Sequence, residues 1–172
     1  MAIRIALALM CVLALPAAAG VASARVAVFP FEMSIDLPPD ALPTMPPKPK
    51  PDEVKRLALV TAELQALLGK SGRYVPVDLS AEKDKIEDKS PFHKCNGCEA
   101  DLAKAVGADI AVTGLIHKVS ESLLSITVML RGAESGDVMG AMNVSIMENN
   151  DEGWLRGVRW LVRNRLLAEA QR

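Results

Sequence analysis

The sequence predicts one α/β domain of the α+β type, in which a mixed five-stranded sheet carries helices packed largely on one face. Three observations support this fold class. Short apolar runs alternate with helical periodicity in the first half of the chain, two strands with alternating polarity follow, and a long amphipathic helix comes last. The order is β-α-β-α-β-β-β-α, and short, right-handed connections favour the spatial strand order 2-1-3-4-5.

The first 24 residues have the layout of a secretory signal peptide. Arg4 supplies a positive charge, an uncharged apolar run extends over residues 5–15, and small residues end at Ala22-Ser23-Ala24. As a helix the apolar run covers about 17 Å, well short of the roughly 30 Å of a bilayer core. We therefore expect cleavage after Ala24, with Ala17-x-Ala19 as the competing site, and a periplasmic domain at residues 25–172 without a membrane span.

Composition excludes several function classes. Only Arg4 among the charged residues precedes position 25, so the net charge changes from −1 for the whole chain to −2 for residues 25–172. A charge so close to zero predicts no affinity for nucleic acid or anionic lipid. Two histidines and one tyrosine leave few acid–base groups, and no Ser-His-Asp set, carboxylate pair or nucleotide loop can be assembled. We expect no catalytic residues and no cofactor.

The first strand and the first helix flank a proline-rich loop. Residues 25–31 (RVAVFPF) are apolar enough for a strand buried on both faces, which ends at Pro30. Residues 34–51 contain seven prolines, which exclude a helix or a central strand and predict an extended loop. From position 52 to Gly69 apolar side chains recur every three or four residues, which predicts a helix.

The middle of the chain alternates again between strand and helix. Residues 74–79 (YVPVDL) predict a strand at the sheet edge, because Pro76 cannot donate to a ladder. Residues 81–89 are nearly all charged and predict a surface turn or a frayed helix. A further helix follows Cys98 and ends at Gly107.

The last third predicts three strands and a helix. Residues 108–119 are apolar at both odd and even positions, which suits a central strand buried on both faces. In residues 124–131 apolar and polar residues alternate, which predicts a strand covered on one face. Turn residues at 134–137 lead to a hairpin strand at 138–147. Residues 151–170 form the last helix, with one apolar side that carries Leu155, Val158, Val162 and Leu166.

Cys95-Asn96-Gly97-Cys98 is the sharpest local signal. Cleavage removes Cys11 and leaves this even pair, which in an exported protein predicts a structural disulfide. A C-x-x-C pair at a helix start also suits thiol–disulfide exchange, because the helix N-terminus favours the thiolate. Here, however, the motif follows a polar loop rather than a strand. Covalent haem is excluded because Glu99 stands where that motif requires histidine.

Metal binding is the third interpretation of this region. His93, Cys95, Cys98 and His117 together offer two imidazoles and two thiolates, a ligand set that suits zinc or copper. The four residues form a site only if the fold brings them together.

The last helix offers a candidate partner surface. Arg156, Arg159 and Arg163 recur on one side, with Trp154 and Trp160 nearby, and a basic stripe beside aromatic rings suits an anionic partner group. A solvated helix face is the ordinary explanation of the same pattern.

Three stretches resemble a known family: residues 25–32 (RVAVFPFE), 95–120 (CNGCEADLAKAVGADIAVTGLIHKVS) and 150–167 (NDEGWLRGVRWLVRNRLL). They resemble a family of uncharacterised exported bacterial proteins, a domain of unknown function. Gly153 stands where the resemblance leads us to expect a small hydroxyl residue. More distantly, the first strand, the GADIAVTG strand and the following hairpin are similar to the N-terminal domain of TolB and to the curli-secretion protein CsgG. Those relatives imply an envelope interaction or assembly module.

The leading hypothesis is therefore a non-catalytic periplasmic interaction module whose partner is an envelope protein. The alternative is a thiol–disulfide or metal-handling protein built on Cys95 and Cys98.

Terminal sequencing of the processed protein should begin at Arg25, because Ala22-x-Ala24 satisfies the small-residue rule for cleavage. An N-terminus at Met1 in a membrane fraction would overturn both the predicted compartment and the argument for a disulfide.

Overall fold

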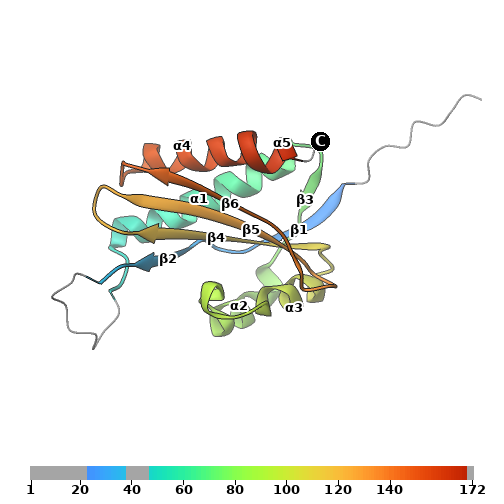
Figure 1. Ribbon diagram of the computed structural model, residues 1–172. Helices are drawn as coiled ribbons and strands as arrows, with labels where there is room; N and C mark the ends of the chain where they lie inside the picture. The colour runs from blue at the N-terminus through green and yellow to red at the C-terminus, as the bar shows by residue number, and fades with distance from the viewer. Residues whose placement is uncertain (1–22, 38–46, 170–172) are drawn as a thin grey trace, which may run out of the picture.

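The computed structural model describes residues 23–37 and 47–169. Residues 1–22 of the expected signal peptide at 1–24 and the middle of the proline-rich loop, residues 38–46, lie outside the described residues. The described part forms one six-stranded sheet with helices on both faces (Figure 1).

The sheet is mixed, and its strand order is β3-β1-β4-β5-β6 with β2 also paired to β4. The strands β3, β1 and β4 are parallel, whereas β4, β5 and β6 form an antiparallel meander. Counted without β2, this order confirms the predicted 2-1-3-4-5. The bounds are β1 Ala24–Val28, β2 Glu32–Ile35, β3 Tyr74–Pro76, β4 Ile110–Lys118, β5 Leu124–Gly132 and β6 Val138–Ile146.

β2 is not predicted by the sequence, so the predicted proline-rich loop begins too early, at residue 34 within this strand. Both β1 and β2 pair with β4, so they are two segments of one line of chain. From Val28 to Glu32 the chain advances four residues while β4 advances only three, from Val112 to Leu115. The extra residue is a bulge at Pro30, which interrupts the pairing without ending it.

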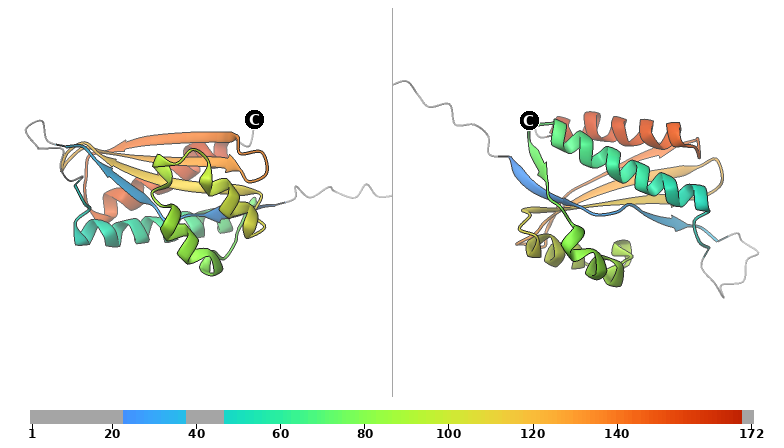
Figure 2. Two further views of the ribbon diagram at one scale, coloured as in Figure 1. Left: turned by 90° about the horizontal axis from the view of Figure 1, so that it is seen from below. Right: turned by 180° about the vertical axis from the view of Figure 1, so that it is seen from behind.

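The helices lie on both faces of the sheet, which corrects the prediction that they pack largely on one. The two long helices, α1 and α4, cover one face, and α2 and α3 lie against the other (Figures 1 and 2). The bounds are α1 Pro51–Lys70, α2 Lys83–Lys89, α3 Cys98–Ala105, α4 Asp151–Leu161 and α5 Leu167–Glu169, with a π-helical segment Val162–Leu166 between the last two.

Two of these helices differ from the sequence expectation for simple reasons. α1 begins at Pro51, the last of the seven prolines, because the first helical position needs no N–H donor. The charged segment predicted as a turn or frayed helix contains α2, because Ile86 is buried under the sheet.

Two apolar cores follow from the alternation of side chains along the central strands. In β1, Val26 and Val28 pack in the core under α1 and α4, while Ala27 belongs to the core under α2 and α3. The second core also contains Phe29 and Phe92, whose ring centroids are 4.8 Å apart. β1 is therefore buried on both faces, as its composition predicts.

A buried ion pair joins α1 to β4. The Lys118 ammonium lies 2.7 Å from Glu53 Oε1, and Glu53 is fully buried. Asn149, in the turn between β6 and α4, also donates to Glu53 Oε1 at 3.0 Å, and the Lys50 N–H donates to Glu53 Oε2 at 2.8 Å. One carboxylate thus connects the start of α1, the end of β4 and the turn before α4.

The start of β1 bears on the expected cleavage site. Ala24 pairs with Tyr74, and the Arg25 N–H donates to Asp109 Oδ2 at 2.7 Å. Cleavage after Ala24 would remove the first residue of the strand and convert the Arg25 nitrogen into an ammonium beside the Asp109 carboxylate. Cleavage after Ala19 would keep the whole strand.

We expect Glu53→Gln to lower the free energy of unfolding at pH 7 by about 3 kcal/mol, the lower end for breaking a buried pair, because Glu121 still accepts from Lys118. Burial raises the pKa of Glu53. The hydrogen bonds from Lys118, Lys50 and Asn149, with the charge of Lys118, outweigh it and hold that pKa below its ordinary value. The ionised Glu53 therefore adds to the free energy of unfolding at any pH above the ordinary pKa of a glutamate. This stabilisation is lost as the pH falls through the lower pKa that Glu53 has in the folded protein.

Urea denaturation from pH 7 downward measures this effect, and the difference between native and variant protein should shrink towards low pH. The control is Glu121→Gln at the exposed partner of Lys118, for which we expect a much smaller loss, because solvent screens an exposed ion pair. Equal losses for the two variants would contradict the assignment of Glu53 as the central acceptor.

Candidate functional site

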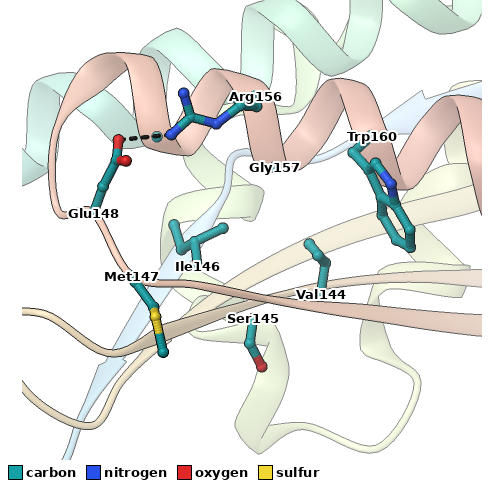
Figure 3. A pocket seen from close by; sticks show the side chains of 9 residues that line it. Val144, Ser145, Ile146, Met147, Glu148, Arg156, Gly157 and Trp160 are labelled. Carbon is teal, nitrogen blue, oxygen red and sulfur yellow. Dashed lines mark hydrogen bonds and ion pairs between the residues drawn. The ribbon is translucent and has the colours of Figure 1, made fainter.

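A groove runs between β6 and α4 and has a volume of about 280 Å³ (Figure 3). We call it the α4–β6 groove. Apolar side chains of β6 form its floor, the first turns of α4 form its wall, and the turn between them closes one end. Its lining residues are Val144, Ser145, Ile146, Met147, Glu148, Gly153, Arg156, Gly157 and Trp160.

The close approach of α4 to the sheet depends on Gly157. A Cβ atom at this position would lie 2.7 Å from Ile126 Cδ1 and 2.9 Å from Ile146 Cγ2, both closer than van der Waals contact allows. The sequence pattern marked only larger apolar residues on this helix. The contact surface of α4 therefore includes a glycine that no hydropathy pattern would select.

The turn that closes the groove is fixed by a helix cap. Asn150 Oδ1 accepts the Gly153 N–H at 2.8 Å, which satisfies a donor at the start of α4. A Cβ atom at Gly153 would lie 2.6 Å from the Glu148 carbonyl oxygen. This contact explains why glycine replaces the hydroxyl residue expected there.

Two exposed apolar side chains border the groove. Met147 is 79% exposed at its end, and Trp160 is 38% exposed at its wall. Arg165 lies over the Trp160 ring, with Cζ 5.8 Å from the ring centroid, a cation–π contact. Arg156 donates to Glu148 Oε2 at 2.6 Å across the top of the groove (Figure 3).

The partner surface predicted from sequence is split by the fold. Trp154 is fully buried in the core under α1 and α4 and donates from Nε1 to Asn149 Oδ1 at 3.2 Å, so it is no part of a partner surface. Arg159 points to α1, where its Nε lies 2.7 Å from Glu63 Oε1. The spacing of the arginines does place them on one side of the helix. Trp154 lies on the opposite side, because each residue turns the helix by about 100° and Trp154 is two residues before Arg156.

Arg156 and Arg163 remain on the outer side of the last helix. Arg156 lines the groove, and Arg163 is exposed about two helical turns further along, in the π-helical segment. Arg163 forms no ion pair with any residue of 23–37 or 47–169. The free charge near the groove is therefore positive at its α5 end.

The Cys95-Asn96-Gly97-Cys98 motif lies at the opposite face of the sheet, before α3. Cys95 and Cys98 are joined by a disulfide, and Gly97 takes a φ of 99° so that the chain can turn between them. Both cysteines pack at the border of the core that contains Phe92. The disulfide thus connects the short 3-10 helix Phe92–Lys94, which Cys95 follows, to Cys98, the first residue of α3.

The four candidate metal ligands are not brought together. His93 Nδ1 lies 2.8 Å from Glu32 Oε2, and His117 Nε2 lies 2.7 Å from Asp36 Oδ1. Among the described residues, the group with metal-ligand spacing is Cys95, Cys98 and Glu99. Its two sulfurs are in the disulfide, and Glu99 is paired with Arg131 at 2.7 Å. The sequence could not show that each histidine has a carboxylate partner of its own.

The α4–β6 groove combines an apolar floor, an exposed aromatic ring and one surface ion pair. Such a lining suits the binding of a side chain or a chain segment. No helix in residues 23–37 and 47–169 is long and apolar enough to cross a bilayer.

Fold and groove together define a small α/β domain with a candidate docking surface at one edge of its sheet. The chain belongs to the family described as protein of unknown function (DUF2380), whose model matches residues 24–166. This finding confirms the resemblance to a family of unknown function. No curated protein matches the chain.

Solved structures share the fold at low sequence identity. The C-terminal domain of LpoB from Salmonella enterica has a TM-score of 0.50 and 12% identity, covering 76% of this chain and 87% of that chain. The lipoprotein GNA1162 from Neisseria meningitidis has a TM-score of 0.50 and 16% identity, covering 83% and 96%. TolB from Acinetobacter baumannii is less similar, with a TM-score of 0.44 and 12% identity over 84% of this chain and 28% of that chain, and this match is too weak to show a shared fold. The resemblance to CsgG stays a prediction.

We expect the double variant Cys95→Ser/Cys98→Ser to fold with a lowered melting temperature. The disulfide closes a short loop, so its contribution lies at the low end of the roughly 2–4 kcal/mol typical of disulfides. A reduction potential below about −300 mV without insulin reduction would support a structural bond.

A potential of about −120 to −270 mV together with turnover would support an oxidoreductase instead. Stoichiometric zinc or copper in protein purified without reductant, absent from the double variant, would contradict both roles.

Proposed function

We propose that this protein is a non-catalytic interaction module of the bacterial cell envelope that binds a protein partner through the α4–β6 groove. The observation that carries the proposal is the position of the groove. It opens beside β6, which ends the strand order of the sheet, and two exposed apolar side chains, Met147 and Trp160, border it. Exposed apolar side chains gathered around a groove are typical of docking surfaces.

Export is supported by the sequence and by the chemistry of the cysteines. The signal-peptide layout of residues 1–24 and the disulfide between Cys95 and Cys98 both suit an oxidising compartment. One protein with the same fold, GNA1162, is described as a lipoprotein.

A thiol–disulfide role is the second candidate, and one specific contact favours it. Cys98 is the first residue of α3, where the helix dipole favours a thiolate. The buried Glu99 places Oε2 3.8 Å from Cys95 Sγ, where a carboxylate can accept the proton of that thiol when the pair is reduced. The reduction potential and the insulin assay decide between this role and a structural bond.

A photo-crosslinking residue placed at Met147 or at Trp160 should capture a defined protein partner in the envelope of the producing cell. The same residue at Val75, which is 48% exposed on the opposite edge strand β3, is the matched control and should not capture that partner. Equal capture at all three positions, or no capture together with turnover of a small substrate, would overturn the proposed function.

A further inference from the structure

The edge strand β6 has an unusual composition for its position. β3 and β6 lie at the two ends of the strand order. β3 has three residues and ends in Pro76, whereas β6 has nine residues, Val-Met-Gly-Ala-Met-Asn-Val-Ser-Ile, with neither a charge nor a proline. Proteins normally protect a sheet edge with charges, prolines or short strands, because an unprotected edge pairs with other chains. β3 is protected in this way. β6 has a bulge at Met139, near its start, but the rest of the strand, from Gly140 to Ile146, pairs regularly with β5 and has no such protection.

The outer side of β6 offers free backbone groups. Within residues 23–37 and 47–169, β6 pairs with β5 alone, and its outward N–H and C=O groups have no hydrogen-bond partner there. In an antiparallel strand, alternate residues point these groups to the same side. They form a row that an added extended chain would satisfy.

Exposed apolar surface gathers along the same edge. Of the ten large hydrophobic side chains exposed in the described residues, four belong to β6 or border its groove: Val138, Met139, Met147 and Trp160. Figure 3 shows that Trp160 and Val144 face each other across the groove beside the strand. A chain paired with β6 would place every second side chain beside this groove.

The charge near the middle of β6 is positive. α4 runs back along β6, with Gly157 against Ile146 and Trp160 beside Val144. Three more helical residues advance about 4.5 Å, between one and two strand residues, which places Arg163 near Met142. Arg163 and Arg165 form no ion pair with any described residue. An acidic side chain on an added strand would therefore find an unpaired cation there.

From these observations we infer that β6 accepts an extended segment of a partner protein as a further strand, with apolar side chains in the α4–β6 groove and an acidic side chain at Arg163. This inference rests on the proposed function and names the class of partner. A second copy of this chain fits less well. Pairing two β6 strands about a twofold axis would bring each Arg163 close to its own copy, and like charges at that contact repel.

The test uses the exported, processed protein and a nine-residue peptide. The peptide alternates Val and Thr, with Glu in place of the central Val, so that Glu and the remaining Val side chains share one face. Added peptide should slow hydrogen exchange at every second amide from Gly140 to Ile146, the amides of the regular part of β6 that do not donate to β5. A counter-probe with Lys in place of Glu should bind about fivefold more weakly, as expected of an exposed ion pair.

Two charge reversals refine the test. Arg163→Glu should invert the preference between the two peptides. Lys89→Glu, on α2 at the other face of the sheet, is the matched control and should leave the preference unchanged.

Four outcomes would overturn the inference. They are uniform or absent protection of β6, protection that both peptides give equally, loss of preference in both variants, and alternate protection that depends on protein concentration without peptide. The last outcome would identify a second copy as the occupant. If crosslinkers at Met147 or Trp160 capture a partner but β6 shows no alternate protection, the proposed function is supported and the inference of an added strand is contradicted.

Discussion

The buried ion pair of Glu53 and Lys118 is the interaction on which the arrangement of α1 and α4 over the sheet depends. Two charges withdrawn from water are tolerated only if every remaining lone pair and proton finds a partner. Glu53 meets this condition by accepting from α1, from β4 and from the turn before α4. That turn also holds Asn149, whose side-chain Oδ1 accepts hydrogen bonds from Trp154 and from Arg56. Glu53 therefore ties the turn before α4 to α1 and β4, and this turn, together with the small Gly157, positions α4 beside its groove.

Much of the fold could be predicted from the sequence because the signals were local and repeated. Alternation in β5 and helical spacing in α1 each extend over enough residues to fix the type of element. β2 was missed because Pro30 normally ends a strand, and only the partner strand shows that pairing resumes after a bulge. α2 was underestimated because its one buried residue, Ile86, matters only when a second core exists beneath the sheet.

The candidate site was harder to predict, and the reasons are geometric. The sequence placed Trp154 and Arg156 on one surface, but the helix directs the first into the core and the second over the groove. Gly157 contributes by lacking a side chain, which no hydropathy pattern reports. The signal that could have identified the edge was available: a nine-residue strand without a charge or proline at the end of the predicted strand order.

The position of β1 has a consequence for the timing of folding. This strand lies between β3 and β4, so its neighbours are residues 74–76 and 110–112, long after it in the chain. Parallel pairing over such separations requires closing large loops before any contact stabilises them, and such topologies form slowly. β1 therefore cannot complete its pairing until residue 112 has been made. If residues 1–24 are the signal peptide that the sequence predicts, this delay would favour export, because a narrow translocation channel passes an unfolded chain.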